Sequence, residues 1–141
     1  MIYLDTSAAV PLFVSEPASG QVEAWFAACD EPLVSSDWMA TEFGSALSIK
    51  TRTGALGARD ANAVWRSFED FCHSGLRLAA VSRRAFAEAA ALARHPAHGL
   101  RAGDALHLAV AREIGVRSMA TLDDLMATNA KRLMIKVVGF S

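Results

Sequence analysis

Short apolar runs alternate along the chain with longer segments in which apolar residues recur at helical spacing. The apolar runs predict β-strands at residues 2–4, 33–35, 76–81, 118–122 and 135–138. The longer segments predict helices at residues 7–14, 18–28, 58–73, 102–114 and 124–133. Two further helices have polar caps, Ser36 and Asp37 for one that ends near residue 54 and Ser82 for one that ends near residue 94. Because strands and helices alternate, the pattern predicts the α/β class, a central, mainly parallel β-sheet flanked by helices.

A sheet of this kind places its ligand sites at one edge, beyond the carboxyl ends of the strands. Asp5 and Asp123 are of interest because each directly follows a predicted strand. No repeat, low-complexity tract or linker interrupts the pattern, so the 141 residues are expected to form one domain, residues 1–141.

The composition supports a globular core and limits how the protein meets nucleic acid. Hydrophobic residues make up 52% of the chain and charged residues 21%. The net charge of −1 argues against a protein that holds nucleic acid mainly through long-range attraction, because such domains are usually strongly basic. The net charge does not exclude an enzyme that binds a phosphodiester locally through a metal ion.

The sequence also predicts a cytoplasmic location. No apolar stretch approaches the roughly 18 residues that spanning a bilayer requires. The N-terminal segment has no basic lead and does not resemble a signal peptide. Cys29 and Cys72 lack metal-ligand spacing, which favours reduced thiols in the cytosol.

Glu42 stands near the middle of the apolar stripe of its predicted helix. At about 100° per residue, Trp38 and Ile49 fall to one side of it and Ala46 to the other. An acid in such a place needs a reason, because carboxylates are normally solvated. The side chain either reaches water from the edge of the stripe, pairs with a neighbouring helix, or serves a functional site.

Asp104 also interrupts an apolar helix face, since Ala111 lies within about 20° of it. Arg101 and Arg112 flank this stripe, so a structural salt bridge is the alternative to a functional role. His107, one turn on, is either a ligand or general base, or a packed residue.

Asp5 and Asp123 carry a weaker individual signal, because an acid between a strand and a helix is commonly an N-cap. Their polar neighbours are caps or hydrogen-bonding supports of the acids: Thr6, Ser7, Thr121 and Asp124. A shared site is favoured because four acids occupy unusual positions in the same chain: two follow strands and two lie on apolar helix faces.

A cluster of carboxylates needs a neutralising proton or cation. Two of them ~5 Å apart repel by about 3 kcal/mol at an effective dielectric of ~20. Oxygen ligands favour Mg²⁺ or Mn²⁺ over zinc, which would call for more His or Cys. The reaction class that follows is metal-assisted hydrolysis of a phosphate ester.

Four segments together resemble the PIN-domain nucleases and, more narrowly, the VapC-type toxins of bacterial toxin–antitoxin pairs. They are MIYLDTSAAV at the start of the chain, TEFGSAL around Glu42, RAGDALHLAVA around Asp104 and ATLDD around Asp123. Each motif alone is weak, but the four occur in the family's order and approximate spacing over nearly the whole chain. Pro11 departs from the pattern, because a helix-friendly residue is commoner there.

The resemblance implies that Asp5, Glu42, Asp104 and Asp123 form the acidic metal site, with Ser7 supporting the first acid and Asp124 as a variable fifth. It implies a parallel sheet between helices and cleavage of structured or transfer RNA. It also implies a homodimer, silenced by a cognate VapB-like antitoxin whose C-terminal segment occupies a groove.

We therefore expect Asp5, Asp104 and Asp123 to hold one or two Mg²⁺ ions, and Glu42 to bind metal or orient the attacking water. The candidate RNA-binding residues at the rim are Lys50, Arg52, Arg94 and Arg101, each of which is alternatively ordinary surface charge.

Three rival hypotheses remain. An aspartate-nucleophile phosphatase usually has a second acid two residues after the first, where this chain has Ser7. A catalytically inactive binding module would keep the fold without the chemistry. An RNA-processing or DNA nuclease would keep the chemistry without a toxin role.

Overall fold

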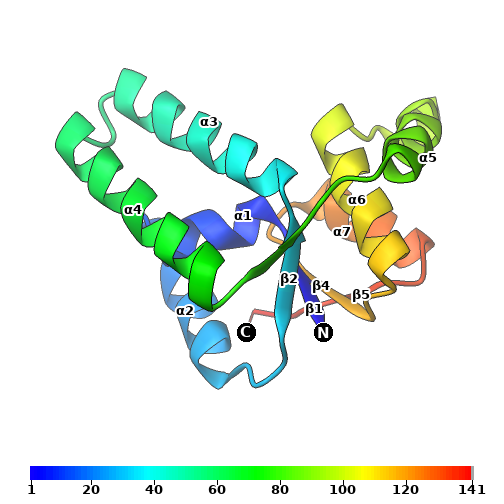
Figure 1. Ribbon diagram of the computed structural model, residues 1–141, viewed down its shortest axis with the longest axis horizontal. Helices are drawn as coiled ribbons and strands as arrows, with labels where there is room; N and C mark the ends of the chain where they lie inside the picture. The colour runs from blue at the N-terminus through cyan, green and yellow to red at the C-terminus, as the bar shows by residue number, and fades with distance from the viewer. Residues whose placement is uncertain (141) are drawn as a thin grey trace.

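The computed structural model describes residues 1–140, which form an α/β fold around one parallel sheet (Figure 1). Within these residues the sheet has five strands in the order β3-β2-β1-β4-β5, and each neighbouring pair is parallel. The predicted fold class is confirmed. The elements in chain order are β1 (Ile2–Leu4), α1 (Thr6–Ala9), a 3-10 helix (Val10–Leu12), α2 (Ser19–Ala28), β2 (Leu33–Ser36), α3 (Trp38–Arg52), α4 (Ala58–Ser74), β3 (Arg77–Ala79), α5 (Arg83–Ala93), a second 3-10 helix (Pro96–His98), α6 (Ala102–Ile114), β4 (Ser118–Ala120), α7 (Asp124–Arg132) and β5 (Lys136–Val137).

The central strand β1 is buried on both faces of the sheet. Ile2 and Leu4 belong to a core shared with α1, α3 and α4. Tyr3 belongs to the core on the other face, which is shared with α5, α6 and α7. Since successive side chains of a strand point to opposite faces, this double burial explains why β1 is a continuous apolar run.

Helices α3 and α4 form an arm that extends away from the sheet (Figure 1). Aromatic rings hold this arm together: Phe43 of α3 and Phe68 of α4 stack with their centroids 4.0 Å apart. Phe13 packs edge-on against both rings. Because Phe43 directly follows Glu42, the same packing fixes the part of α3 that carries this acid.

The first helix is shorter than the sequence predicts. A helix was expected over residues 7–14, but α1 ends at Ala9 and the chain continues as a 3-10 helix. Pro11 has no N–H to donate and its ring crowds the preceding turn, so the α-helix does not continue through it. Among the helices of residues 1–140, none combines the length and the apolar composition that crossing a lipid bilayer requires.

The predicted caps have different outcomes. Ser36 does not cap α3, since its buried Oγ has no hydrogen-bond partner among the described residues. Ser82 caps α5 as expected, because its hydroxyl accepts a hydrogen bond of 2.9 Å from the Ala85 N–H. Asp37 precedes α3 in a helical conformation and makes no side-chain cap. Its own N–H instead donates to the Ala79 carbonyl at 2.9 Å, which ties the start of α3 to β3.

Candidate active site

The elements bring the four predicted acids to one edge of the sheet. Asp5 directly follows β1, and Asp123 follows β4 and precedes α7. These two strands are parallel neighbours, and the strand order reverses between them, which is where open α/β sheets bind ligands. Glu42 comes from α3 and Asp104 from the first turn of α6.

Asp5 is buried, with 4% of its surface exposed, and its neighbours hold one of its two oxygens. Ser7 Oγ donates to Asp5 Oδ2 at 2.6 Å, and Thr121 Oγ1 donates to the same oxygen at 2.8 Å. The Leu122 N–H in turn donates to Ser7 Oγ at 2.9 Å. Residues that follow β1 and β4 therefore fix the orientation of this carboxylate together.

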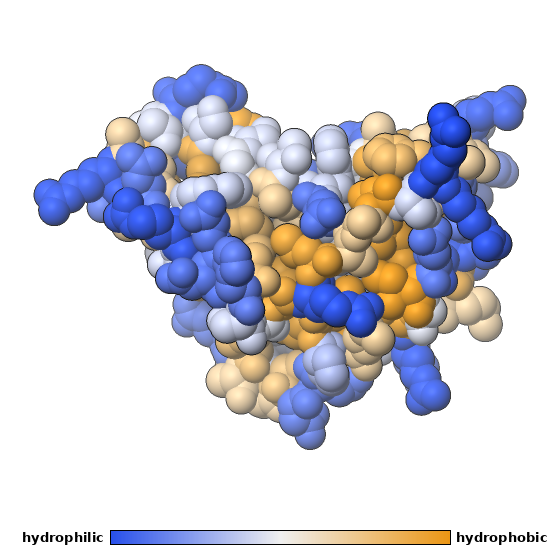
Figure 2. Space-filling model, viewed as in Figure 1, coloured by the Kyte–Doolittle hydropathy of each residue, from blue (hydrophilic) through white to orange (hydrophobic). Residues whose placement is uncertain are grey.

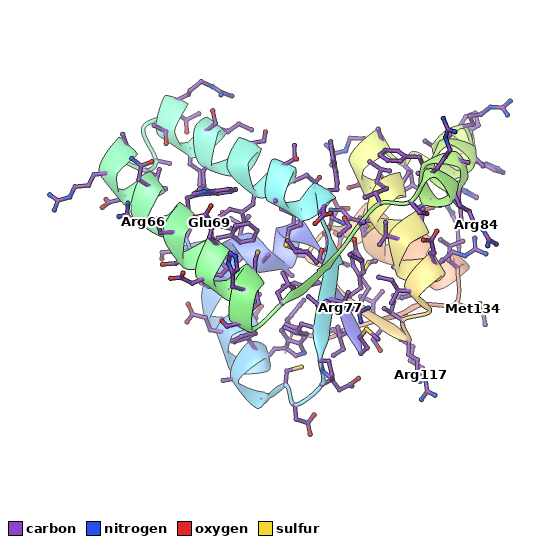
Figure 3. The ribbon with its side chains drawn as sticks, in the orientation of Figure 1. Arg66, Glu69, Arg77, Arg84, Arg117 and Met134 are labelled. Carbon is purple, nitrogen blue, oxygen red and sulfur yellow. The ribbon has the colours of Figure 1, made fainter. Side chains whose placement is uncertain are left out.

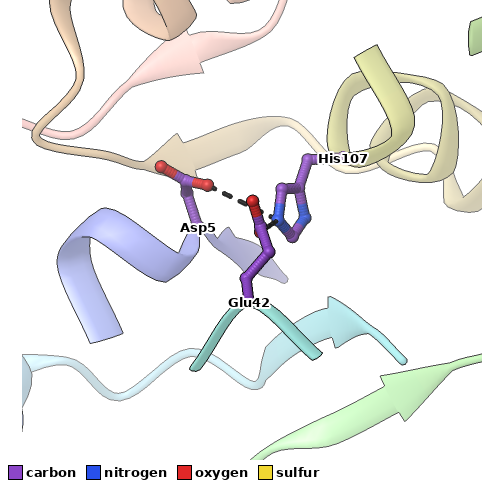
Figure 4. Close-up of side chains that lie close together, drawn as sticks. All are labelled: Asp5, Glu42 and His107. Carbon is purple, nitrogen blue, oxygen red and sulfur yellow. Dashed lines mark hydrogen bonds and ion pairs between the residues drawn. The ribbon is translucent and has the colours of Figure 1, made fainter. Parts of the chain in front are cut away.

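Glu42 is held by a threonine and by His107, whose contact with Glu42 is drawn in Figure 4. Thr6 Oγ1 donates to Glu42 Oε1 at 2.7 Å, and His107 Nε2 is hydrogen-bonded to the same oxygen. Burial alone would raise the pKa of Glu42, but the contacts with His107 and Thr6 outweigh it and hold this pKa below its usual value. Glu42 is therefore ionised at neutral pH.

His107 lies beneath the acids with no exposed surface. Its Nδ1 is 2.6 Å from the Tyr3 hydroxyl, and its Nε2 is 3.7 Å from Asp5 Oδ1. Asp5, Glu42 and His107 each offer one potential ligand atom, and these atoms lie within 4.8 Å of one another. The sequence left His107 as either a packed residue or a functional one, and the structure places it both in the core and in contact with the site.

Asp104 lies in an acidic environment. Its Oδ2 is buried and has no hydrogen-bond partner among the described residues, although Arg101 Nε is 3.7 Å away. Burial raises the pKa of Asp104, and the charges of Asp123 and Asp5 raise it further against the opposing effect of Arg101. The alternative pairing with Arg112 is wrong, because Arg112 binds Glu88 at 2.6 Å.

Asp123 serves as a helix cap and also faces the other acids. Its Oδ1 accepts a hydrogen bond of 2.9 Å from the Met126 N–H, which caps α7. Its Oδ2 is 3.6 Å from Arg101 Nη2. Asp124, the expected variable acid, lies exposed in the first turn of α7.

A cleft of about 530 Å³ lies beside the acids. Its lining residues are Thr6, Trp38, Thr41, Glu42, Ser45, Ala46, Ile49, Arg101, Gly103 and Asp104. Gly103 allows a close approach, since a Cβ there would lie 2.9 Å from Glu42 Oε2 and 2.9 Å from Trp38 Nε1. Sequence reasoning missed Gly103, although a glycine beside a candidate acid in a helix is disfavoured and needs a reason.

The basic residues expected at the rim separate into different environments. Arg101 lines the cleft, whereas Lys50 pairs with Glu16 at 2.6 Å. Arg52 donates to Ser48 at 2.6 Å, and Arg94 is exposed at the end of α5. Other arginines, such as those labelled at positions 66, 84 and 117, project outward from the periphery (Figure 3).

Comparison with known proteins agrees with this geometry. The family model described as the PIN domain matches residues 2–131. This chain belongs to the PIN-domain family. The family indicated by the four sequence motifs is therefore confirmed.

Two curated relatives of this PIN domain are Ribonuclease VapC45 and Ribonuclease VapC49, from two strains of Mycobacterium tuberculosis. Each is 34% identical over 115 residues, which cover 82% of this chain and 77% of the relative.

Solved structures show the same fold at lower identity. VapC20 of Mycobacterium tuberculosis, described as a sarcin–ricin loop cleaving toxin, has a TM-score of 0.74 at 21% identity, over 92% of this chain and 95% of that chain. FitAcB from Neisseria gonorrhoeae has a TM-score of 0.72 at 18% identity, over 99% and 97%. A structure of FitAB bound to a DNA fragment has a TM-score of 0.68 at 20% identity, over 98% and 94%.

Proposed function

We propose that this PIN domain is a metal-dependent endoribonuclease that hydrolyses RNA phosphodiester bonds. The observation that carries the proposal is the gathering of Asp5, Glu42, Asp104 and Asp123 between β1 and β4, beside an open cleft. The curated relatives are named ribonucleases, which supports RNA as the substrate.

The donor set suits a hard divalent cation, Mg²⁺ or Mn²⁺. The buried Asp104 Oδ2 has no hydrogen-bond donor among the described residues, and burial together with the charges of neighbouring acids raises the pKa of the group. A cation at this position would bind the unpartnered oxygen and offset the repulsion between the acids. Asp5, Asp104 and Asp123 are therefore the residues that would hold it, and Glu42 would either bind it as well or lie next to it. Such an ion would neutralise negative charge on the scissile phosphate and would lower the pKa of a bound water.

The chain's own residues would orient the reactants. Glu42 is ionised and held at Oε1 by Thr6 and His107, so it can orient the attacking water through Oε2. Asp5 keeps Oδ1 turned toward the site because Ser7 and Thr121 hold Oδ2. Arg101, at the rim of the cleft, is placed to contact an RNA phosphate.

The biological role that fits best is that of the toxin in a VapBC-like pair, acting in the cytoplasm on transfer or ribosomal RNA. A VapB-like antitoxin segment would bind in the cavity of about 400 Å³ between α3 and α4, which Trp65 and Leu47 line. A homodimer would use the apolar surface that Figure 2 shows in the middle of one face, around the position labelled Arg77 in Figure 3. A housekeeping RNA-processing or DNA nuclease is the alternative.

Cleavage assays test the chemistry and the substrate class together. Purified protein is incubated with total RNA, transfer RNA and single-stranded DNA, in Mg²⁺, in Mn²⁺ or in EDTA. RNA cleavage should require the metal, be restored by adding metal back, and be absent for Asp5→Asn. Equal cleavage in EDTA would contradict the metal mechanism, and cleavage of DNA alone would favour a DNA nuclease.

A further inference from the structure

His107 is a fully buried imidazole whose two ring nitrogens both have partners. Tyr3, on β1, is also fully buried and contacts Nδ1, while Glu42, on α3, contacts Nε2. Burying a polar ring is costly unless its hydrogen bonds are made, so this chain of contacts gives the histidine a defined place. It also joins the central strand to the helix that carries an acid of the site.

Tyr3 determines which nitrogen of His107 accepts a hydrogen bond. Tyr3 is fully buried, and a phenol carries its proton at neutral pH, so its hydroxyl can donate a hydrogen bond. The Tyr3 hydroxyl lies 2.6 Å from His107 Nδ1, so its O–H is placed to donate to that nitrogen.

A neutral imidazole that accepts at Nδ1 carries its proton on Nε2. That N–H meets Glu42 Oε1, which as part of a carboxylate can only accept. The opposite tautomer would place the nitrogen lone pair against the carboxylate lone pairs. The arrangement of partners therefore selects one tautomer.

We propose that His107 is a positioning residue of the nuclease: Tyr3 fixes its tautomer, and its Nε2–H holds Glu42 Oε1 so that Oε2 faces the cleft. This inference rests on the function proposed above. Thr6 donates to the same Oε1 at 2.7 Å, and Oε2 lies toward Gly103, which lines the cleft. Glu42 is thereby limited to one orientation.

Kinetics separate this role from packing. His107→Leu fills similar space without an N–H, whereas His107→Gln can still donate an amide N–H to Glu42. The leucine variant should lose about 10- to 100-fold in kcat with KM for RNA nearly unchanged, because a misoriented group slows the chemical step. The glutamine variant should recover at least half of that loss on a logarithmic scale. Equal kcat values for the two variants, per folded molecule, would overturn the proposal.

The tautomer can be measured on the wild-type protein without RNA or metal. The chain has four histidines, and ¹⁵N-histidine labelling reports the protonated nitrogen of each ring. The signal that disappears in His107→Gln, or in His107→Leu if the glutamine variant does not fold, belongs to His107. It should show the proton on Nε2, and Tyr3→Phe should shift it toward a mixture. A proton on Nδ1 in wild type would overturn the proposal for His107, even if the protein cleaves RNA. If wild type has the proton on Nε2 but does not cleave RNA, the result would count against the nuclease function and not against the tautomer.

Discussion

Asp5, Glu42 and Asp123 each commit one carboxylate oxygen to the protein scaffold and keep the other turned toward the site. Asp5 Oδ2 accepts from two hydroxyls, and Glu42 Oε1 accepts from Thr6 and contacts His107. Asp123 Oδ1 caps α7. The hydrogen bonds therefore orient each acid through one oxygen and leave the second oxygen available as a ligand, as expected for a cation site.

The substitution Gly103→Ala tests the clearance beside Glu42. The new methyl would lie 2.9 Å from both Glu42 Oε2 and Trp38 Nε1, so one of them has to move. We expect kcat for RNA cleavage to fall at least 10-fold. The free energy of unfolding should fall by at most about 2 kcal/mol, because overpacking costs about 1–3 kcal/mol and the better helix propensity of alanine returns about 1 kcal/mol.

Gly44→Ala is the matched control, since its Cβ would meet only Trp65 at an ordinary 3.7 Å. This control should stabilise the protein by about 0.5–1 kcal/mol through helix propensity and leave kcat unchanged. Melting temperatures and steady-state kinetics of both variants decide the question. Full activity of Gly103→Ala would show that Glu42 tolerates displacement.

Some site residues were predictable from the sequence and others were not. Glu42 and Asp104 were identifiable because acids on apolar helix faces are unusual. The contact between His107 and Tyr3 was not, because it joins residues 104 positions apart and depends on how α6 lies over β1. Sequence patterns give the period of a helix but not its rotation against a distant strand.

The positions at which strands and helices begin and end determine where the site residues lie. β1 and β4 stop directly before Asp5 and shortly before Asp123, and α6 begins two residues before Asp104. The pattern predicted the order and type of these elements because their apolar spacing is regular. It extended the first helix through Pro11 and made β3 longer than Arg77–Ala79, since ends depend on tertiary hydrogen bonds.

Arg101, directly before α6, tests the role of the rim. Its guanidinium contacts Asp104 and Asp123 and is 78% exposed at the cleft, so it is free to reach a phosphate. Arg101→Gln should raise KM for RNA several-fold and weaken its dependence on salt, because one phosphate contact is lost. Arg117→Gln, at an exposed position before β4, is the control and should leave both unchanged. Identical salt dependence in the two variants would remove Arg101 from the RNA interface.

At the scale of the whole molecule, one hydrophobic core packs against each face of the sheet. The core with α3 and α4 carries Glu42, and the core with α6 and α7 carries Asp104 and Asp123. The site lies where the two cores meet at the end of β1. Its geometry therefore depends on the complete fold.

Expression in a bacterial host tests the toxin role. The wild-type chain should arrest growth, and Asp5→Asn at equal protein level should not, because the substitution removes one charge from the proposed metal site. Asp70→Asn, on an exposed position of α4, is the control and should remain toxic. Normal growth with soluble, RNA-cleaving wild type would favour a housekeeping nuclease.

Asp104 links the stability of the fold to the charge of the site. Its pKa is raised, so the ionised group lowers the stability of the metal-free protein at neutral pH. This cost is present above the folded-state pKa and is relieved as the pH falls through it. Relative to Asp104→Asn, metal-free wild type should therefore gain stability on acidification from neutral pH toward the carboxyl range, as thermal melts across that range would show.

Thermal melts of wild type and Asp104→Asn, in EDTA and in saturating Mg²⁺, test the acidic metal centre most directly. In EDTA the variant should be as stable as wild type or more stable by about 1–3 kcal/mol, because it removes repulsion from Asp123 and Asp5 and loses only the contact with exposed Arg101. In Mg²⁺ it should lose most of the stabilisation that the ion confers on wild type, which grows as RT ln(1 + [L]/Kd). A variant that is destabilised in EDTA and keeps the full Mg²⁺ shift would contradict the account.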